Sequence, residues 1–218
     1  MRGAELKLTG VELHADNGHL LLGDVNLVLT PGWYGLEGAN GSGKTALLKA
    51  IAGLYQPARG LITYQLHGVA LSGNAFKPYL GYKPQQAAYY DNMTVEAYLR
   101  YVGEMKLMPR TTTTIDERSR ELCERLGLSN ERKTPIQRLS GGNKQRLMIV
   151  QAMLADPWFL LLDEPLYGMD IEIRFLLLDA LYEMTPGTVA IFSGALEGLQ
   201  GGWLDAVIKL DNGTAALH

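Results

Sequence analysis

The stretch from Gly38 to Thr45 places glycines, a lysine and a hydroxyl residue at a spacing suited to binding phosphate. It reads Gly-Ala-Asn-Gly-Ser-Gly-Lys-Thr and fits the pattern G-x-x-x-x-G-K-[ST]. Glycines let backbone N–H groups approach a phosphate closely, and the start of a following helix adds partial positive charge. In this pattern Lys44 contacts the β- and γ-phosphates of a nucleotide, and the Thr45 hydroxyl binds Mg²⁺. The sequence therefore predicts a phosphate-binding loop over residues 38–45.

The residues on either side of this loop predict the strand and the helix that the motif requires. An apolar run over 33–36 is typical of a strand, and apolar residues at helical spacing predict a helix over 44–54. A glycine-rich turn with no phosphate to bind is the competing interpretation, but the constrained positions and both flanks match the motif. The residues expected to contact the nucleotide are Gly38, Asn40, Gly41, Ser42, Gly43, Lys44, Thr45 and Ala46.

A second candidate anion site lies far along the chain, at Ser140-Gly141-Gly142. The serine is suited to capping a helix whose apolar residues recur over 147–154. Two glycines in the first turn would leave backbone N–H groups bare, which favours an anion. We expect a helical insert to separate this site from the 38–45 loop. The two sites would then meet one nucleotide in a head-to-tail dimer.

Two carboxylates follow directly after an apolar run over 160–162. Asp163 can hold Mg²⁺, directly or through water, at the end of the predicted strand. Glu164 is one residue further on, where it can polarise a water for attack on a γ-phosphate. A strand that ends in solvated acids is the competing interpretation of these two residues taken alone.

The remaining segments predict an α/β chain with a helical insert. Strands are expected at 6–13, 25–29, 61–64, 158–162, 188–192, 206–210 and 214–217. The early strands are expected to be antiparallel, the first of them broken at Gly10, whereas a continuous apolar run is typical of a strand covered on both faces. Helices are expected at 94–105, 114–127 and 171–184. The second of these opens with a Thr114-x-x-Glu117 capping box, and the middle of the chain, residues 86–138, is predicted to be all helical.

The composition indicates a sizeable core and no strong bias of charge. The chain has 218 residues, 47% of them apolar, and a formal net charge of −3, which gives no indication of nucleic-acid binding. Cys123 is the only cysteine, which excludes an internal disulfide and fits a reducing compartment. We expect its side chain to fill the core. Apolar runs such as 158–162 are too short to cross a bilayer, so a membrane-spanning part would belong to another chain.

The order of these motifs resembles that of ATP-binding-cassette (ABC) ATPases, the nucleotide-binding subunits of ABC transporters. Residues 38–45 match the Walker A motif of that family. Residues 139–146, Leu-Ser-Gly-Gly-Asn-Lys-Gln-Arg, match its LSGGQ signature, and Asp163 and Glu164 match the Walker B aspartate and the catalytic glutamate. The resemblance extends over nearly the whole chain, and the signature at this spacing is specific.

Two further segments are identified only through the resemblance to this family. Gln85 matches the family's Q-loop glutamine, and residues 165–170 lie where its D-loop belongs. The resemblance implies a P-loop NTPase core with a mainly parallel central sheet, an N-terminal antiparallel β subdomain and an inserted α-helical subdomain. It implies a single nucleotide-binding domain over 1–218, with a catalytic core at about 1–85 and 156–218 and a helical subdomain at about 86–155.

The resemblance also implies an ATPase that binds ATP and Mg²⁺. Glu164 would position or activate the attacking water, and Lys44 would clamp the phosphate charge. The residues implied to serve Mg²⁺ are Thr45, Gln85 and Asp163, of which Gln85 would also touch the attacking water.

The implied partners are a second nucleotide-binding subunit and an integral membrane permease, with no nucleic acid. The two subunits would pair head to tail, as a homodimer or a heterodimer, and ATP-driven closure of the dimer would be passed to the permease. The segment from Gln85 through residues 91–96 is similar to exporter ATPases whose permease is a separate chain. The resemblance therefore implies a cytoplasmic subunit held at the inner face of the cell membrane.

The chain departs from the family pattern at three places. Asn143 replaces the signature glutamine and keeps a polar amide. Gly194 stands where the family has a histidine that contacts the γ-phosphate, which implies a low intrinsic rate. Residues 1–32 contain no Phe, Tyr or Trp to stack on adenine. His14 or His19 could substitute, although a solvated loop histidine is the simpler interpretation.

Other functions remain open at this point. A hydrolysis-impaired regulatory or partner subunit of a heteromeric ABC complex would fit the missing histidine, whereas the retained Glu164 argues against it. An ABC ATPase that acts on DNA or ribosomes usually carries a long coiled-coil insertion or two cassettes, and this chain has neither. A GTPase is disfavoured because the chain has no N-K-x-D motif.

Tyrosines gather near the predicted helical insert, at Tyr79, Tyr82, Tyr89, Tyr90, Tyr98 and Tyr101. They are either core of the insert or the lining of a groove that receives a cytoplasmic helix of the permease. Tyr89 and Tyr90 are expected to be the exposed pair.

Overall fold

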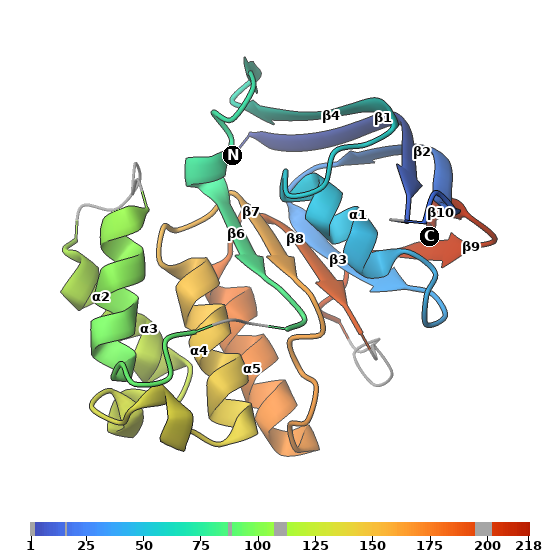
Figure 1. The fold of residues 1–218 in the computed structure, drawn as a ribbon. Coiled ribbons are helices and arrows are strands. Elements are labelled where there is room, and N and C mark those ends of the chain that lie inside the picture. Colours follow the sequence, from blue (N-terminus) through green and yellow to red (C-terminus); the bar gives the residue numbers. More distant parts are fainter. Residues whose placement is uncertain (1–2, 16, 87–88, 107–112, 195–201) are drawn as a thin grey trace. The chain divides into compact units, whose positions relative to one another are not determined.

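The chain folds into two units, each of which combines strands with helical segments (Figure 1). Unit 1 comprises Met1–Lys77 and Pro186–His218, and unit 2 comprises Pro78–Thr185. The structure is a computed structural model that describes residues 3–15, 17–86, 89–106, 113–194 and 202–218. The predicted subdomain boundaries near residues 86 and 155 stay a prediction.

Unit 1 contains an antiparallel sheet with the strand order β2-β1-β4-β5. Its strands are β1 (Ala4–His14), β2 (Leu20–Leu29), β4 (Arg59–Leu66) and β5 (Val69–Leu71). Apolar side chains of β1 alternate into the core, which is why this segment forms a half-buried strand. The backbone at Gly10 has φ +58°, and the register with β2 shifts between Leu8 and Val11. The predicted antiparallel pairing is confirmed, whereas the predicted break at Gly10 is not, because β1 continues through Gly10 with an irregular register.

Unit 1 also contains mainly parallel strands, the first of which, β3, leads into the 38–45 loop. They are β3 (Gly32–Glu37), β8 (Val189–Ser193), β9 (Ala206–Asp211) and β10 (Thr214–Leu217). β3 pairs in parallel with β8 and with β9, and β10 is antiparallel to β9. Helix α1 (Lys44–Ile51) follows the loop. It ends before the predicted residue 54 because Gly53 takes φ +68°, a conformation that terminates helices.

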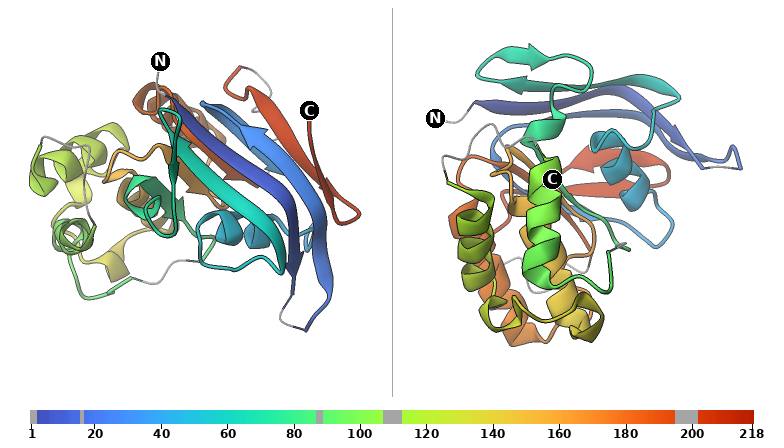
Figure 2. Two further views of the ribbon diagram at one scale, coloured as in Figure 1. Left: turned by 90° about the horizontal axis from the view of Figure 1, so that it is seen from above. Right: turned by 60° about the vertical axis from the view of Figure 1, so that its left-hand side comes forward.

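In unit 2, β6 (Leu80–Lys83) and β7 (Phe159–Leu162) pair in parallel. β7 is buried at every position, as predicted for a strand covered on both faces. β6 was missed from the sequence, because a four-residue strand that contains a glycine and a lysine has almost no apolar pattern. The helices of this unit, drawn from two further sides in Figure 2, are α2 (Val95–Met105), α3 (Ile115–Arg125), α4 (Gly141–Met153) and α5 (Ile171–Met184).

Local capping explains where α2 and α3 begin. The Thr94 hydroxyl accepts a hydrogen bond from the Ala97 amide at 3.3 Å. At α3, the Glu117 amide donates to the Thr114 hydroxyl at 3.2 Å, and the Thr114 amide donates to the Glu117 carboxylate at 2.9 Å. The predicted capping box is therefore confirmed.

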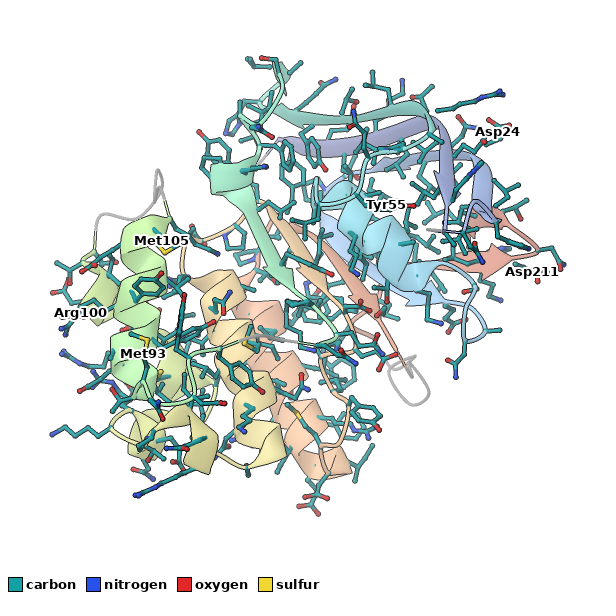
Figure 3. All side chains as sticks on the ribbon, viewed as in Figure 1. Asp24, Tyr55, Met93, Arg100, Met105 and Asp211 are labelled. Atoms are coloured by element: carbon teal, nitrogen blue, oxygen red, sulfur yellow. The ribbon has the colours of Figure 1, made fainter. Side chains whose placement is uncertain are left out.

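Arg100, labelled on α2 in Figure 3, donates two hydrogen bonds of 3.0 Å to Asp116 of α3 and ties the two helices together.

The predicted mixed α/β fold class is confirmed, with an antiparallel sheet, mainly parallel strands and a helical region over α2 to α4. Cys123 is fully buried on α3, as predicted for a core residue, and burial raises the pKa of its thiol to about 11. Of the helices formed by described residues, none combines the length and the apolar character needed to cross a bilayer.

Removal of the Thr114 hydroxyl should destabilise the helical region. Thr114→Ala deletes one arm of the capping box, so we expect the free energy of unfolding to fall by about 1 kcal/mol. Chemical denaturation followed by circular dichroism measures this change. Thr114→Ser is the matched control and should retain the stability of the wild type. Equal losses in both variants would show that the hydroxyl does not cap α3.

Candidate active site

The 38–45 loop begins where β3 ends and adopts a backbone that glycine alone takes without strain. Gly38, Gly41 and Gly43 have φ of +156°, +83° and +99°. Gly43 is the N-cap of α1 and contributes no side-chain hydrogen bond to the helix. The amides of the first turn of α1 therefore have no side-chain cap, which leaves them available to an anion.

The polar side chains of the loop fit a bound phosphate and its metal ion. Lys44 Nζ donates to the carbonyls of Gly38 at 2.6 Å and Ala39 at 3.0 Å, which holds the ammonium against the loop. The Ser42 hydroxyl is buried and has no hydrogen-bond partner among the described residues. An orphaned hydroxyl beside uncapped amides, with the Thr45 hydroxyl in the first turn, is a donor set suited to phosphate and Mg²⁺. Asn40 is exposed and Ala46 half-buried in the same segment.

In unit 2, the two carboxylates follow β7 as predicted. Asp163 is only 1% exposed, and Glu164 is half-buried. Glu164 has φ +47° and precedes Pro165. A residue before proline favours extended backbone, so a positive φ here is strained, at a typical cost of about 1–3 kcal/mol. The Tyr167 amide donates to the Glu164 carbonyl at 3.4 Å and closes a turn over this segment.

Lys83, at the end of β6, is fully buried beside these carboxylates. Its Nζ donates to the backbone carbonyls of Asp163 at 2.7 Å and Glu164 at 3.1 Å. Burial lowers the pKa of Lys83 to about 8, against the opposing effect of the two carboxylates, so the group keeps its proton at pH 7. The sequence analysis missed this residue. The available signal was a lysine two residues before the predicted functional Gln85, in a segment with few other charges.

Tyr82 precedes Lys83 on β6 and is half-buried near Asp163. Its hydroxyl is buried and has no hydrogen-bond partner among the described residues. Burial, with a smaller effect from Asp163, raises the pKa of this phenol to about 12. The phenol therefore stays neutral at physiological pH.

Ser140 caps α4 as predicted. Its hydroxyl accepts a hydrogen bond from the Asn143 amide at 3.1 Å. Nothing lies within 4 Å of where a Cβ would stand at Gly141 or Gly142, so the first turn of the helix is open to an approaching group. The side-chain amide of Asn143 donates to Glu131 at 3.3 Å, which ties the altered signature position to a neighbouring turn.

Gln85 is exposed and lines a pocket of about 230 Å³ next to the start of α4. The pocket is lined by Gln85, Gln86, Tyr89, Lys144, Gln145 and Met148. The Lys144 ammonium lies 5.6 Å from the centre of the Tyr89 ring. The structure thus brings the predicted Q-loop residue together with the residues that follow the Ser140-Gly141-Gly142 segment.

The tyrosine cluster divides between core and surface. Tyr98 is buried and donates its hydroxyl to Gln151. Tyr90 is 57% exposed and meets the ring of Tyr101 edge-on at 5.5 Å. Tyr89 is half-buried, so of the predicted exposed pair only Tyr90 lies fully at the surface.

Other predicted positions have simpler surroundings. The His14 ring nitrogen lies 2.7 Å from a Glu12 carboxylate oxygen, and the His19 ring contacts the Leu20 carbonyl at 2.8 Å. Gly194 follows β8 and has φ +119°, while residues 195–201 lie outside the described residues.

Within the described part of the chain, no group of three or more His, Cys, Asp or Glu side chains could bind a metal ion by itself. The 38–45 loop and Ala46 lie in unit 1, as do His14, His19 and Gly194. Unit 2 contains Gln85, Ser140, Gly141, Gly142, Asp163 and Glu164.

Comparison with known proteins agrees with these motifs. Residues 22–167 match the family model described as ABC transporter. The uncharacterized ABC transporter ATP-binding protein YxlF of Bacillus subtilis (strain 168) is 36% identical over 158 residues, covering 72% of this chain and 51% of that protein. The Nod factor export ATP-binding protein I of Azorhizobium caulinodans is 29% identical over 169 residues, covering 77% of this chain and 52% of that protein.

The fold is also similar to a solved structure of an ATP binding subunit of an ABC transporter, with a TM-score of 0.84 and 26% sequence identity. That similarity covers 98% of this chain and 89% of the other. The chain spans only about half the length of the two curated relatives above.

A methyl group at Gly38 should disrupt the loop more than one at Gly41. A Cβ at Gly38 would collide with the Ser42 hydroxyl and lie 2.8 Å from the Leu210 carbonyl, whereas Gly41 has open space around it. We expect Gly38→Ala to weaken Mg-ATP binding at least about 10-fold, equivalent to about 1.4 kcal/mol. Gly41→Ala, the matched control, carries only backbone strain of about 1–2 kcal/mol. Calorimetric titration measures both, and equal losses of affinity would contradict the steric argument.

Proposed function

Since the chain belongs to the ABC transporter family, we propose that it hydrolyses ATP to drive transport through a permease carried on a separate chain. The observation that carries this proposal is the pairing of two features in one chain. The 38–45 loop presents uncapped helix amides and a lysine to phosphate, and the Asp163–Glu164 pair is retained at the end of β7. A chain that only bound the nucleotide could use Asp163 for Mg²⁺ but would have no need of Glu164.

Each site residue has a proposed role in this reaction. The loop amides and Lys44 bind the phosphates, and Glu164 positions or activates the attacking water. Thr45, Asp163 and Gln85 would hold Mg²⁺, which neutralises phosphate charge when bound. Ser140, Gly141 and Gly142 bind the nucleotide of a second subunit through the open first turn of α4.

The assembly we propose is a head-to-tail pair of nucleotide-binding subunits at the inner face of a membrane, attached to an integral membrane permease. Two helix starts suited to anions in one chain, those of α1 and α4, support the pairing, because each nucleotide would then contact one helix start from each subunit. The name of the Nod factor export relative supports an exporter. The pocket beside Gln85, with the exposed Tyr90 nearby in sequence, is the surface we assign to the permease.

Glu164→Gln tests the proposed function. The amide cannot accept a proton from water, so we expect ATP hydrolysis to fall at least about 100-fold while Mg-ATP affinity is preserved. Phosphate release measures the rate, and calorimetry measures the affinity. In the same assays Lys44→Ala should weaken Mg-ATP affinity at least about 10-fold. Unchanged hydrolysis by Glu164→Gln would refute the assigned role, and a wild type that hydrolyses no ATP, alone or with its permease, would refute the function.

Gly194 should limit the rate of the isolated protein. The loss of one oriented contact to the transition state typically costs roughly 100- to 1,000-fold in rate, so we expect slow turnover with intact binding. Because Gly194 has φ +119°, any side chain there strains the backbone. Gly194→Ala therefore serves as the matched control for Gly194→His. We expect kcat of Gly194→His to exceed that of Gly194→Ala at least about 10-fold, and equal kcat values would show that the missing imidazole is not limiting.

A further inference from the structure

The end of β7 is held by a side chain that belongs to β6. The two strands pair in parallel as far as Lys83 opposite Leu162, and the Asp163 amide donates to the Lys83 carbonyl at 2.9 Å. Beyond that point the strand pairing stops. The Lys83 side chain then continues the hydrogen bonding, with its ammonium on the carbonyls of Asp163 and Glu164 at 2.7 Å and 3.1 Å.

A fully buried lysine is costly to a fold, and apolar residues of similar volume are often as stable or more so in such places. Lys83 is 0% exposed and stands on a strand whose partner, β7, is entirely apolar. The Lys83 ammonium is a compact charge with three N–H donors, so it can hydrogen-bond to two successive carbonyls at once. Stability of the strand pair alone therefore gives no reason for a lysine at this position.

The Lys83 ammonium binds the carbonyl of Glu164, the residue whose backbone is strained. Glu164 has a positive φ immediately before Pro165, and such a backbone persists only when its surroundings determine it. Its carbonyl accepts from Lys83 on one side and from the Tyr167 amide on the other. The contact of Lys83 with the Asp163 carbonyl fixes the peptide plane before Glu164, and the contacts of Lys83 and Tyr167 with the Glu164 carbonyl fix the plane after it. Together the two planes set the direction in which the Glu164 side chain leaves the backbone.

We propose that Lys83 is a positioning residue for ATP hydrolysis, which fixes the backbone of Asp163 and Glu164 so that the Glu164 carboxylate is aimed at the attacking water. This inference rests on the proposed function, because it assigns Glu164 to that water. It requires no contact between Lys83 and the nucleotide. Loss of the ammonium should consequently lower kcat and leave the affinity for nucleotide nearly unchanged.

Lys83→Met tests this role in the full-length protein, because methionine keeps most of the apolar stem and removes every donor. Lys106→Met is the matched control. Lys106 is the other lysine in unit 2 whose pKa burial lowers to about 8, and it too donates to a backbone carbonyl, that of Gln151 at 3.1 Å. The control thus removes the ammonium of a half-buried lysine and its contact with the Gln151 carbonyl, which does not involve Glu164.

The measurements are kcat for Mg-ATP and the affinity for a non-hydrolysable ATP analogue. We expect Lys83→Met to lower kcat at least about 10-fold and to change the analogue affinity less than about 3-fold. Lys106→Met should keep kcat within about 2-fold of the wild type. Retained kcat in Lys83→Met, or equal losses in the two variants, would overturn the positioning role.

A second measurement reports on the segment itself. Hydrogen exchange of the peptide that spans residues 160–170 should be faster in Lys83→Met than in the wild type or Lys106→Met, and unchanged exchange would overturn the proposal. If Lys83→Met fails to fold, Lys83→Gln replaces it, because glutamine retains a shorter neutral donor. Lys83→Gln should show reduced kcat with preserved affinity for the analogue. A kcat equal to that of the wild type would overturn the positioning role. A wild type without ATPase activity would instead refute the proposed function, which separates the two failures.

Discussion

Burial of the parallel strands on both faces confines most of their polar side chains to the points where the strands end. β7 and β8 are buried at every position, and nearly all of their side chains are apolar. A polar side chain within such a strand would lose water without gaining a partner. In unit 1 the polar groups accordingly follow β3, in the 38–45 loop. In unit 2 they lie at the last residue of β6, Lys83, and directly after β7, at Asp163 and Glu164.

Each strand end leaves backbone groups without a partner in the sheet, and the two units satisfy them in opposite ways. After β3, the chain turns through glycines with positive φ and presents amides of α1 that no side chain caps. We propose that these amides bind phosphate. After β7, the carbonyls of Asp163 and Glu164 turn towards a buried ammonium. The first arrangement gains its partner on binding a ligand, whereas the second has its partner within the fold.

Elements defined by local signals were predictable. The capping box at Thr114, the cap at Ser140 and the helix Ile171–Met184 lie where the sequence placed them, because caps and helical periodicity act within a few residues. β6 and β5 were missed, since short strands obtain their stability from neighbours that are distant in sequence. The same reason hid Lys83, whose partners Asp163 and Glu164 are some eighty positions away.

The sequence by itself determined the family, and it predicted the phosphate-binding loop and the carboxylate pair, because each is a contiguous motif whose spacing reflects its chemistry. It also determined the α/β class through the alternation of apolar strands with capped helices. Only the tertiary structure decided that Glu164 has a strained backbone and that a buried lysine holds it. Backbone conformation at a single residue and the burial of a charge depend on contacts between segments that are far apart along the chain, and no local pattern encodes them.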